Sequence, residues 1–245
     1  MLPVLALNAW LRYDCITRSL AKLPGVDSIL EIGTGLGAVG ARLAARYGYV
    51  GLEPSKESCA VARRRIEPLG GTVICGDVTA LDPGEMFALA CAFEVIEHIE
   101  DDEGSLRLWR KHIRPGGWVM LSTPPFQSRF GPLDQGGGHY RRYEPDWMAE
   151  LLVKTGFKEP RIWLYGFPLG YALEAARNGL ATLSRKEKEG ESFAERTEAS
   201  GRWWQPPDWL APVTQAATLP FRIMQRPFLG TRYGTGLFAL AQRRD

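Results

Sequence analysis

The chain has 245 residues, of which 45% are hydrophobic and 24% are charged, and its formal net charge at pH 7 is +2. A chain of this length can bury a sizeable core in one domain, and a nearly balanced charge does not favour nucleic acid or an anionic membrane as a partner. The four cysteines lack metal-type spacing, so we expect buried thiols in a reducing cytoplasm; they are Cys15, Cys59, Cys75 and Cys91. We expect a cytoplasmic protein without signal peptide or membrane span, because no basic region precedes an apolar run and no apolar stretch is long enough.

Strands and helices are predicted to alternate along the first two thirds of the chain. Apolar residues at helical spacing predict a leading helix over residues 5–20. Strands are predicted over about 28–32, 49–53, 72–76, 87–93, 117–122 and 158–165. Helices are predicted up to about Tyr47, over 56–67, through Leu106, Trp109 and Ile113, and over 144–156, where Gly156 is a stop signal. This alternation is typical of a doubly wound, mostly parallel α/β sheet.

A final strand is predicted over residues 236–241, and an unusually long segment separates it from the sixth strand. Residues 167–183 have the pattern of an apolar helix, and a second apolar segment contains Met224, Phe228 and Leu229. We interpret residues 166–229 as a helical cap inserted into a single domain of residues 1–245.

The middle of this insertion is dominated by charged residues and tryptophan. A dense mixed-charge run lies within residues 184–202, for which a solvated surface is favoured over a partner-binding role. Two roles are equally compatible with Trp203, Trp204 and Trp209: they pack within the cap, or they line a substrate pocket.

The most informative stretch is residues 29–37, where a short apolar run containing Glu31 leads into glycines at alternate positions. Such a pattern predicts a strand that turns sharply into a helix, which is a nucleotide-type site in open α/β sheets. Gly33, Gly35 and Ala38 satisfy a relaxed dinucleotide fingerprint with Glu53 as the ribose-binding acid. Two observations argue against NAD. The Glu31 carboxylate would repel a pyrophosphate but suits a positively charged ligand. The chain also has no Tyr-x-x-x-Lys pair, which removes one common hydride-transfer site.

Five segments in chain order resemble the motifs of the class I (Rossmann-like) S-adenosylmethionine (SAM)-dependent methyltransferases. They are Glu31-x-Gly33-x-Gly35-x-Gly37, residues 49–55, residues 75–78, residues 93–99, and residues 113–118 together with 122–125. The last two are similar to the ubiquinone- and menaquinone-biosynthesis-type small-molecule enzymes of that family. The resemblance covers roughly residues 25–165, and five motifs in the correct order are more specific than any one.

The resemblance implies a seven-stranded sheet of order 3-2-1-4-5-7-6, with the last strand antiparallel and the cap between strands six and seven. It implies SAM as the cofactor, with Glu53 accepting hydrogen bonds from both ribose hydroxyls and Asp77 binding near the adenine amine. The implied cofactor-binding residues are Glu31, Gly33, Thr34, Gly35, Gly37, Glu53, Pro54, Ser55, Asp77, Val78, Glu94, Val95 and His98.

Glu53 and Asp77 also make chemical sense without the family. A single carboxylate can accept two hydrogen bonds from a diol, and an Asp can accept one from an exocyclic amine. The alternative is that both acids only start helices or turns. The glycine turn upstream favours the ligand-binding interpretation.

The chemistry of methyl transfer indicates which further residues matter. The acceptor attacks the sulfonium methyl group in line, and orientation with exclusion of water supplies much of the acceleration, so no metal is expected. A general base helps when the acceptor is a protonated hydroxyl. Of the three histidines, His112 is expected at the surface and His98 in the cofactor floor, which leaves His139 as the first candidate base.

His139 lies in a glycine-rich loop over residues 136–143, which resembles the Gly-His-x-Arg-x-Tyr segment of the family. The alternative is a structural loop in which His139 and Arg142 hydrogen-bond to the backbone around the glycines. In a further alternative, Arg141 or Arg142 binds an acidic group of the acceptor. The candidate substrate-binding residues are Tyr140, Arg142, Tyr143, Phe167, Tyr171 and Trp204.

Three classes of function remain after the sequence analysis. The leading one is a SAM-dependent methyltransferase acting on a small molecule at a hydroxyl or carboxylate oxygen. A nucleic-acid methyltransferase is disfavoured, because residues 93–98 lack the Asn/Asp-Pro-Pro-aromatic motif that grips a flipped base and no basic stripe is present. An NAD-dependent oxidoreductase is the third class, and a non-catalytic relative is a further alternative. The expected partner is a small-molecule acceptor rather than nucleic acid, with a homodimer as the assembly considered.

Overall fold

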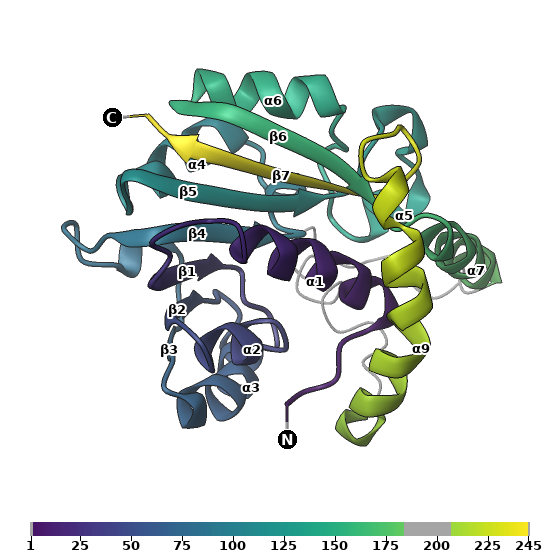
Figure 1. The fold of residues 1–245 in the computed structure, drawn as a ribbon, viewed down its shortest axis with the longest axis horizontal. Coiled ribbons are helices and arrows are strands. Elements are labelled where there is room, and N and C mark those ends of the chain that lie inside the picture. The colour runs from purple at the N-terminus through teal and green to yellow at the C-terminus, as the bar shows by residue number, and fades with distance from the viewer. Residues whose placement is uncertain (1, 184–206, 245) are drawn as a thin grey trace.

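The computed structural model describes residues 2–183 and 207–244, and its centre is one seven-stranded sheet (Figure 1). The strand order is β3-β2-β1-β4-β5-β7-β6. Strands β1 to β5 run parallel to one another, and β7 runs antiparallel between β5 and β6. The predicted fold class and strand order are therefore confirmed. The bounds are β1 Ser28–Ile32, β2 Gly48–Leu52, β3 Thr72–Ile74, β4 Phe87–Phe93, β5 Ile113–Thr123, β6 Phe157–Tyr165 and β7 Gly236–Arg243.

Most predicted helices are present with small shifts at their ends. Their bounds are α1 Leu7–Leu20, α2 Gly40–Ala44, α3 Lys56–Ile66, α4 Asp102–Lys111, α5 Pro132–Gly136, α6 Pro145–Lys154, α7 Leu169–Leu183 and α9 Ala211–Met224. Helix α2 ends at Ala44 rather than near Tyr47. Ile113 was wrongly assigned to a helix: it is the first residue of β5, where it pairs with Phe87. Helix α5, in the loop after β5, was not predicted.

The two faces of the sheet are covered by different helices because side chains alternate along each strand. Ile29 and Leu89 belong to a core cluster shared with α1, α2 and α3. Their neighbours Leu30 and Ala90 belong to a second cluster shared with α4 and α6. All seven residues of β4 are buried, as expected for a central parallel strand covered on both faces. Because β1 to β5 are parallel to one another, their carboxyl ends lie at the same edge of this sheet.

The segment between β6 and β7 contributes α7 and α9, as the apolar patterns predicted. Helix α9 lies beside α1 (Figure 1) and is fixed to it by polar contacts. The Trp10 indole donates to the Thr214 hydroxyl at 3.1 Å, and the Gln225 amide donates to the Leu11 carbonyl at 3.0 Å. The charged run and Trp203 and Trp204 lie outside the described residues. Interpretation of residues 166–229 as a cap within one domain stays a proposal.

Two sequence-based expectations were wrong, one about the cysteines and one about His112. Cys59 of α3 and Cys75, which follows β3, form a disulfide instead of two thiols, because packing of α3 on β3 brings their Cα atoms to 5.6 Å. Cys15 and Cys91 are buried thiols, as expected. His112 is buried rather than at the surface, because its imidazole Nδ1 bonds the Glu85 carbonyl at 2.9 Å as the chain turns into β5. Within residues 2–183 and 207–244, no helix has the length and apolar character needed to cross a membrane.

Candidate functional site

The glycine turn after β1 is the centre of the expected cofactor site. Gly33, Gly35 and Gly37 have φ angles of +70°, +57° and +77°, which side chains rarely adopt. A Cβ at Gly33 would lie 2.6 Å from the Val95 side chain, and one at Gly37 would lie 3.0 Å from the Ala62 Cα atom. A Cβ at Gly35 would meet nothing within 4 Å. Gly33 and Gly37 therefore allow close packing, and only Gly35 faces open space that a ligand can occupy.

Because of this difference, a substitution at Gly35 should mainly affect cofactor binding, whereas one at Gly37 should mainly affect the stability of the protein. We expect Gly35→Ala to weaken SAM binding at least tenfold, because the new methyl group occupies the ligand's space. Its cost in the free energy of unfolding is the left-handed strain of about 1–2 kcal/mol. Gly37→Ala carries the same strain plus overlap with Ala62, so it should cost more stability. Calorimetric titration and denaturant unfolding of both variants test this; equal SAM affinity of wild type and Gly35→Ala would contradict it.

Glu53, just after β2, joins the glycine turn to the loop that starts α3. Its carboxylate accepts the Gly35 N–H at 2.8 Å and the Ser55 N–H at 3.0 Å. An ionised carboxylate only accepts hydrogen bonds, which is the chemistry that the hydroxyls of a diol need. Ser55 itself caps α3, and the exposed Pro54 lies between the two. Glu53 is therefore held in a fixed position beside the open space at Gly35.

Asp77 lies at the neighbouring carboxyl end of β3 and is exposed. Its Oδ1 atom accepts from the Thr79 hydroxyl at 2.6 Å and the Thr79 N–H at 2.8 Å, which lowers the pKa of Asp77. The turn-starting interpretation is thus observed, and it orients an ionised carboxylate rather than excluding a ligand role. Val78, the next residue, is buried in the core.

Glu31 lies in β1 beneath the glycine turn and is buried. Its Oε2 atom accepts from the Tyr49 hydroxyl at 2.5 Å and from the Thr34 hydroxyl at 3.3 Å. Burial raises the pKa of Glu31 to about 7, although these two hydrogen bonds act in the opposite direction. The carboxyl group therefore titrates near neutrality, and a nearby cation would favour its ionised form.

The segment after β4 carries strained and buried acids. Glu94 has a φ of +59°, which is unfavourable for a residue with a side chain and is common at functional sites. Its Oε1 atom lies 3.1 Å from the Arg12 guanidinium and accepts from the Ser122 hydroxyl at 2.9 Å. Glu97 is fully buried, and burial raises its pKa well above the ordinary range, with Glu94 adding to the shift.

His139 is oriented by a buried carboxylate that the sequence analysis missed. Its Nδ1 atom lies 3.0 Å from Oδ1 of Asp134 in α5. Burial raises the pKa of Asp134, but hydrogen bonds from His139 and Arg142 outweigh it and lower the pKa to about 2. An ionised carboxylate only accepts, so Nδ1 of His139 carries the hydrogen and Nε2 is the basic nitrogen of the neutral ring. The loop is therefore ordered around a carboxylate–imidazole pair, which fixes the orientation and the tautomer of the His139 ring.

His98 lies against His139, and burial lowers its pKa. The two rings are edge to face with centroids 4.6 Å apart. Burial lowers the pKa of His98 to about 4, so this imidazole is neutral at pH 7, and its Nδ1 atom contacts the Gly138 carbonyl at 3.0 Å. Glu97, His98 and His139 bring one potential metal-ligand atom each to within 4.8 Å of one another. The expectation that no metal takes part stays a prediction, which the effect of a chelator on turnover tests.

The candidate substrate-binding residues do not all face one cavity. Tyr143 is fully buried, and its hydroxyl donates to Asp102 at 2.8 Å, which indicates a structural role. Arg141 pairs with the same Asp102 at 2.7 Å, whereas Tyr140 is 40% exposed. The ring centroid of Phe167 lies 6.0 Å from that of Tyr171 at the start of α7, and Trp204 lies outside the described residues.

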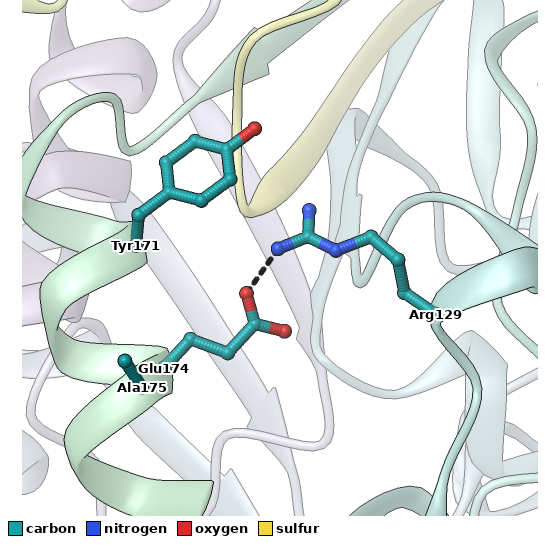
Figure 2. A pocket seen from close by; sticks show the side chains of 4 residues that line it. All are labelled: Arg129, Tyr171, Glu174 and Ala175. Atoms are coloured by element: carbon teal, nitrogen blue, oxygen red, sulfur yellow. Dashed lines mark hydrogen bonds and ion pairs between the residues drawn. The ribbon is translucent and has the colours of Figure 1, made fainter.

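A cavity of about 360 Å³ lies between α7 and the loop after β5. It is lined by Arg129, Tyr171, Glu174 and Ala175, and Figure 2 shows the Arg129 and Glu174 side chains directed toward each other. Among the described substrate-binding candidates, only Tyr171 lines it, while Arg142 lies 3.3 Å from Glu174. The sequence analysis missed Arg129 and Glu174. The one signal for Glu174 was a charge that interrupts an otherwise apolar helix pattern.

Comparisons with known proteins agree with this geometry. A family model described as a methyltransferase domain matches residues 29–117, which include the glycine turn, Glu53, Asp77 and the segment after β4. The ubiquinone biosynthesis O-methyltransferase of Chromobacterium violaceum is 34% identical over 180 residues, which cover 71% of this chain and 73% of that protein. Further curated relatives of the same name match over about half of their own length or less.

Solved structures resemble the whole described fold. The phosphoethanolamine N-methyltransferase 2 of Haemonchus contortus, solved with phosphomonomethylethanolamine and S-adenosylhomocysteine, matches with a TM-score of 0.60 at 14% identity. That match covers 96% of this chain and 53% of the other. A SAM-dependent methyltransferase of Thermotoga maritima matches with a TM-score of 0.57 at 18% identity, covering 96% and 89% of the two chains. At such identities these structures establish the fold alone.

Proposed function

The chain belongs to the SAM-dependent methyltransferases, and from this premise we propose that it methylates an oxygen atom of a small-molecule acceptor by in-line displacement. When bound, SAM supplies an electrophilic methyl group on a sulfonium. The residues that would hold it are Glu53 and Asp77 at the adenosine and Glu31 below the turn. The open space at Gly35 fits such a ligand, because a Cβ there would meet no protein atom.

The observation that carries the choice of oxygen is the Asp134–His139 pair. A phenol or alcohol is protonated at neutral pH, and the enzyme gains from a base that removes this proton during transfer. Nε2 of His139 is such a base, because Asp134 fixes the hydrogen on Nδ1. A thiol acceptor, with an ordinary pKa of about 8.5, would have less need of it. The name O-methyltransferase carried by the Chromobacterium relative supports the same choice for this chain.

Two other functions make different predictions for the same titration. A nucleic-acid methyltransferase would bind an oligonucleotide tightly, and an NAD-dependent oxidoreductase would bind NAD at the glycine turn. We expect SAM and S-adenosylhomocysteine to bind in calorimetric titrations, and NAD and oligonucleotides not to bind. Binding of NAD without binding of SAM would overturn the proposal. That the protein is located in the cytoplasm and that it forms a homodimer remain proposals from the sequence.

Ionisation of Glu31 gives a pH-dependent test of its place at the cofactor. A carboxyl group with a pKa of about 7 is largely protonated at pH 6, and a bound cation stabilises the charged form. SAM binding should therefore release a proton from Glu31 near pH 6–7. The release should disappear near pH 9, where Glu31 is already ionised.

The released protons are counted by calorimetry in buffers of different ionisation enthalpy. Glu31→Gln is the control, because it retains an acceptor for Tyr49 while removing the titrating group, and any titration of SAM itself persists in it. Identical proton release by wild type and Glu31→Gln would exclude Glu31 from the cation's surroundings.

A further inference from the structure

A second charged cluster lies directly behind the Asp134–His139 pair. The Arg142 Nε atom donates to Asp134 at 2.8 Å, so one carboxylate contacts both His139 and Arg142. Nη1 of Arg142 then lies 3.3 Å from Glu174 of α7. The Glu174 carboxylate also bonds Arg129, as Figure 2 shows from the side of the cavity. The proposed base and the cavity are therefore connected through two side chains.

One guanidinium group of this cluster, that of Arg129, lines the cavity, and a second, that of Arg142, contacts the same Glu174. Arg142 is almost fully buried, with 5% of its side chain exposed, and Arg129 is 27% exposed. The Arg129 guanidinium lies 5.1 Å from the centre of the Tyr171 ring and donates to the Gly234 carbonyl at 3.0 Å. Buried cations need an anion nearby, and a carboxylate suits the planar fork of arginine. Glu174 is the anion that both arginines share.

Glu174 comes from a different part of the chain than the groups that it neutralises. Both arginines belong to the loop after β5, together with His139, whereas Glu174 lies on α7 in the segment between β6 and β7. A carboxylate on a ligand has the same charge and shape as that of Glu174. The cavity of about 360 Å³ is open to solvent beside the Arg129–Glu174 pair, so a ligand can reach this pair.

Building on the proposed function, we propose that the methyl acceptor is a hydroxylated carboxylic acid whose carboxylate binds Arg129 and Arg142. Glu174 holds the place of this carboxylate in the free enzyme and leaves the arginines when the acid binds. Arg129 and Arg142 thus determine specificity without contacting the transferred methyl group.

The experiment compares acids with their neutral amides as acceptors of labelled methyl groups from SAM. The pairs are hydroxybenzoates, dihydroxybenzoates and hydroxycinnamates, each with the matching amide. For the best pair, kcat/KM should favour the acid over the amide by at least tenfold in the wild type. Arg129→Gln should abolish this preference. Glu174→Gln should increase kcat/KM for the acid by several fold, because the internal competitor loses its charge while the side chain keeps its shape.

The matched control is Arg107→Gln, which removes the same charge from an exposed Arg–Glu pair on α4. It should retain the acid preference, and thermal melting should show all three variants to be folded. The proposal is overturned if no acid is preferred over its amide, or if Arg129→Gln keeps the preference. Reduced kcat/KM for the acid in Glu174→Gln would show that Glu174 assists binding rather than competing. Binding of SAM with transfer to neutral acceptors would overturn only this inference, whereas absence of SAM binding would overturn the proposed function.

Discussion

Replacing Glu53 with alanine is expected to weaken SAM binding by between tenfold and a few hundredfold. A hydrogen bond to a charged group contributes about 1.5–3 kcal/mol, and the proposed contact involves two ribose hydroxyls. The loss also has an indirect part, because Glu53 accepts the Gly35 and Ser55 N–H groups and so orders the two loops. Calorimetric titration with SAM and with S-adenosylhomocysteine measures the effect, which should be similar for both because both contain the ribose.

Asp82→Ala is the control for this variant, since Asp82 is an exposed acid outside the residues assigned to the cofactor. It should bind SAM like the wild type. Unchanged affinity in Glu53→Ala, with the protein folded, would mean that Glu53 only orders the loops and that the ribose lies elsewhere.

His139→Ala is expected to lower turnover by about a hundredfold or more while SAM affinity stays unchanged. A factor of one hundred corresponds to about 2.7 kcal/mol of transition-state stabilisation, a typical contribution of general base catalysis. The effect should appear in kcat rather than in the cofactor titration, because His139 acts on the acceptor's proton. Steady-state kinetics with a phenolic acceptor, together with calorimetric titration of SAM, separate the two quantities.

Asp134→Asn provides a second readout that a merely structural loop would not give. The amide can present its oxygen or its NH₂ group to His139, so the ring is no longer held with hydrogen on Nδ1. We expect turnover between that of the wild type and that of His139→Ala. Wild-type turnover in His139→Ala would assign the acceleration to proximity alone or move the proton transfer to Tyr140.

The elements that the sequence predicted well are those determined by local pattern. The alternating apolar runs and glycines placed β1, β2 and β4 within about one residue, because short buried strands bounded by turn residues have few alternatives. The relation of Glu53 to Gly35 followed from the fact that parallel strands bring their carboxyl ends to one edge. The sequence also raised the alternative that Glu53 and Asp77 bond to the backbone at helix or turn starts, but it did not indicate that Glu53 would accept the Gly35 N–H.

The residues that the sequence analysis missed are placed by the fold of an irregular loop or by long-range packing. Asp134 meets His139 because a short helix, α5, folds the loop back on itself, and Glu174 meets Arg129 across 45 residues of chain. Neither pair has a spacing that periodicity can detect. The Cys59–Cys75 disulfide was missed for the same reason, since only the docking of α3 against β3 brings the sulfur atoms together. Charged pairs between loops thus depend on the tertiary fold and become visible only with it.

The most direct test of the account is the fate of the methyl group. The enzyme is incubated with SAM labelled in its methyl group and with phenols, sugars, carboxylic acids and amines, and each labelled product is identified by mass spectrometry. We expect label on the oxygen of a hydroxylated small molecule, and strongly reduced label with His139→Ala. Label confined to nitrogen or to nucleic acid, or no transfer from an enzyme that binds SAM, would contradict it.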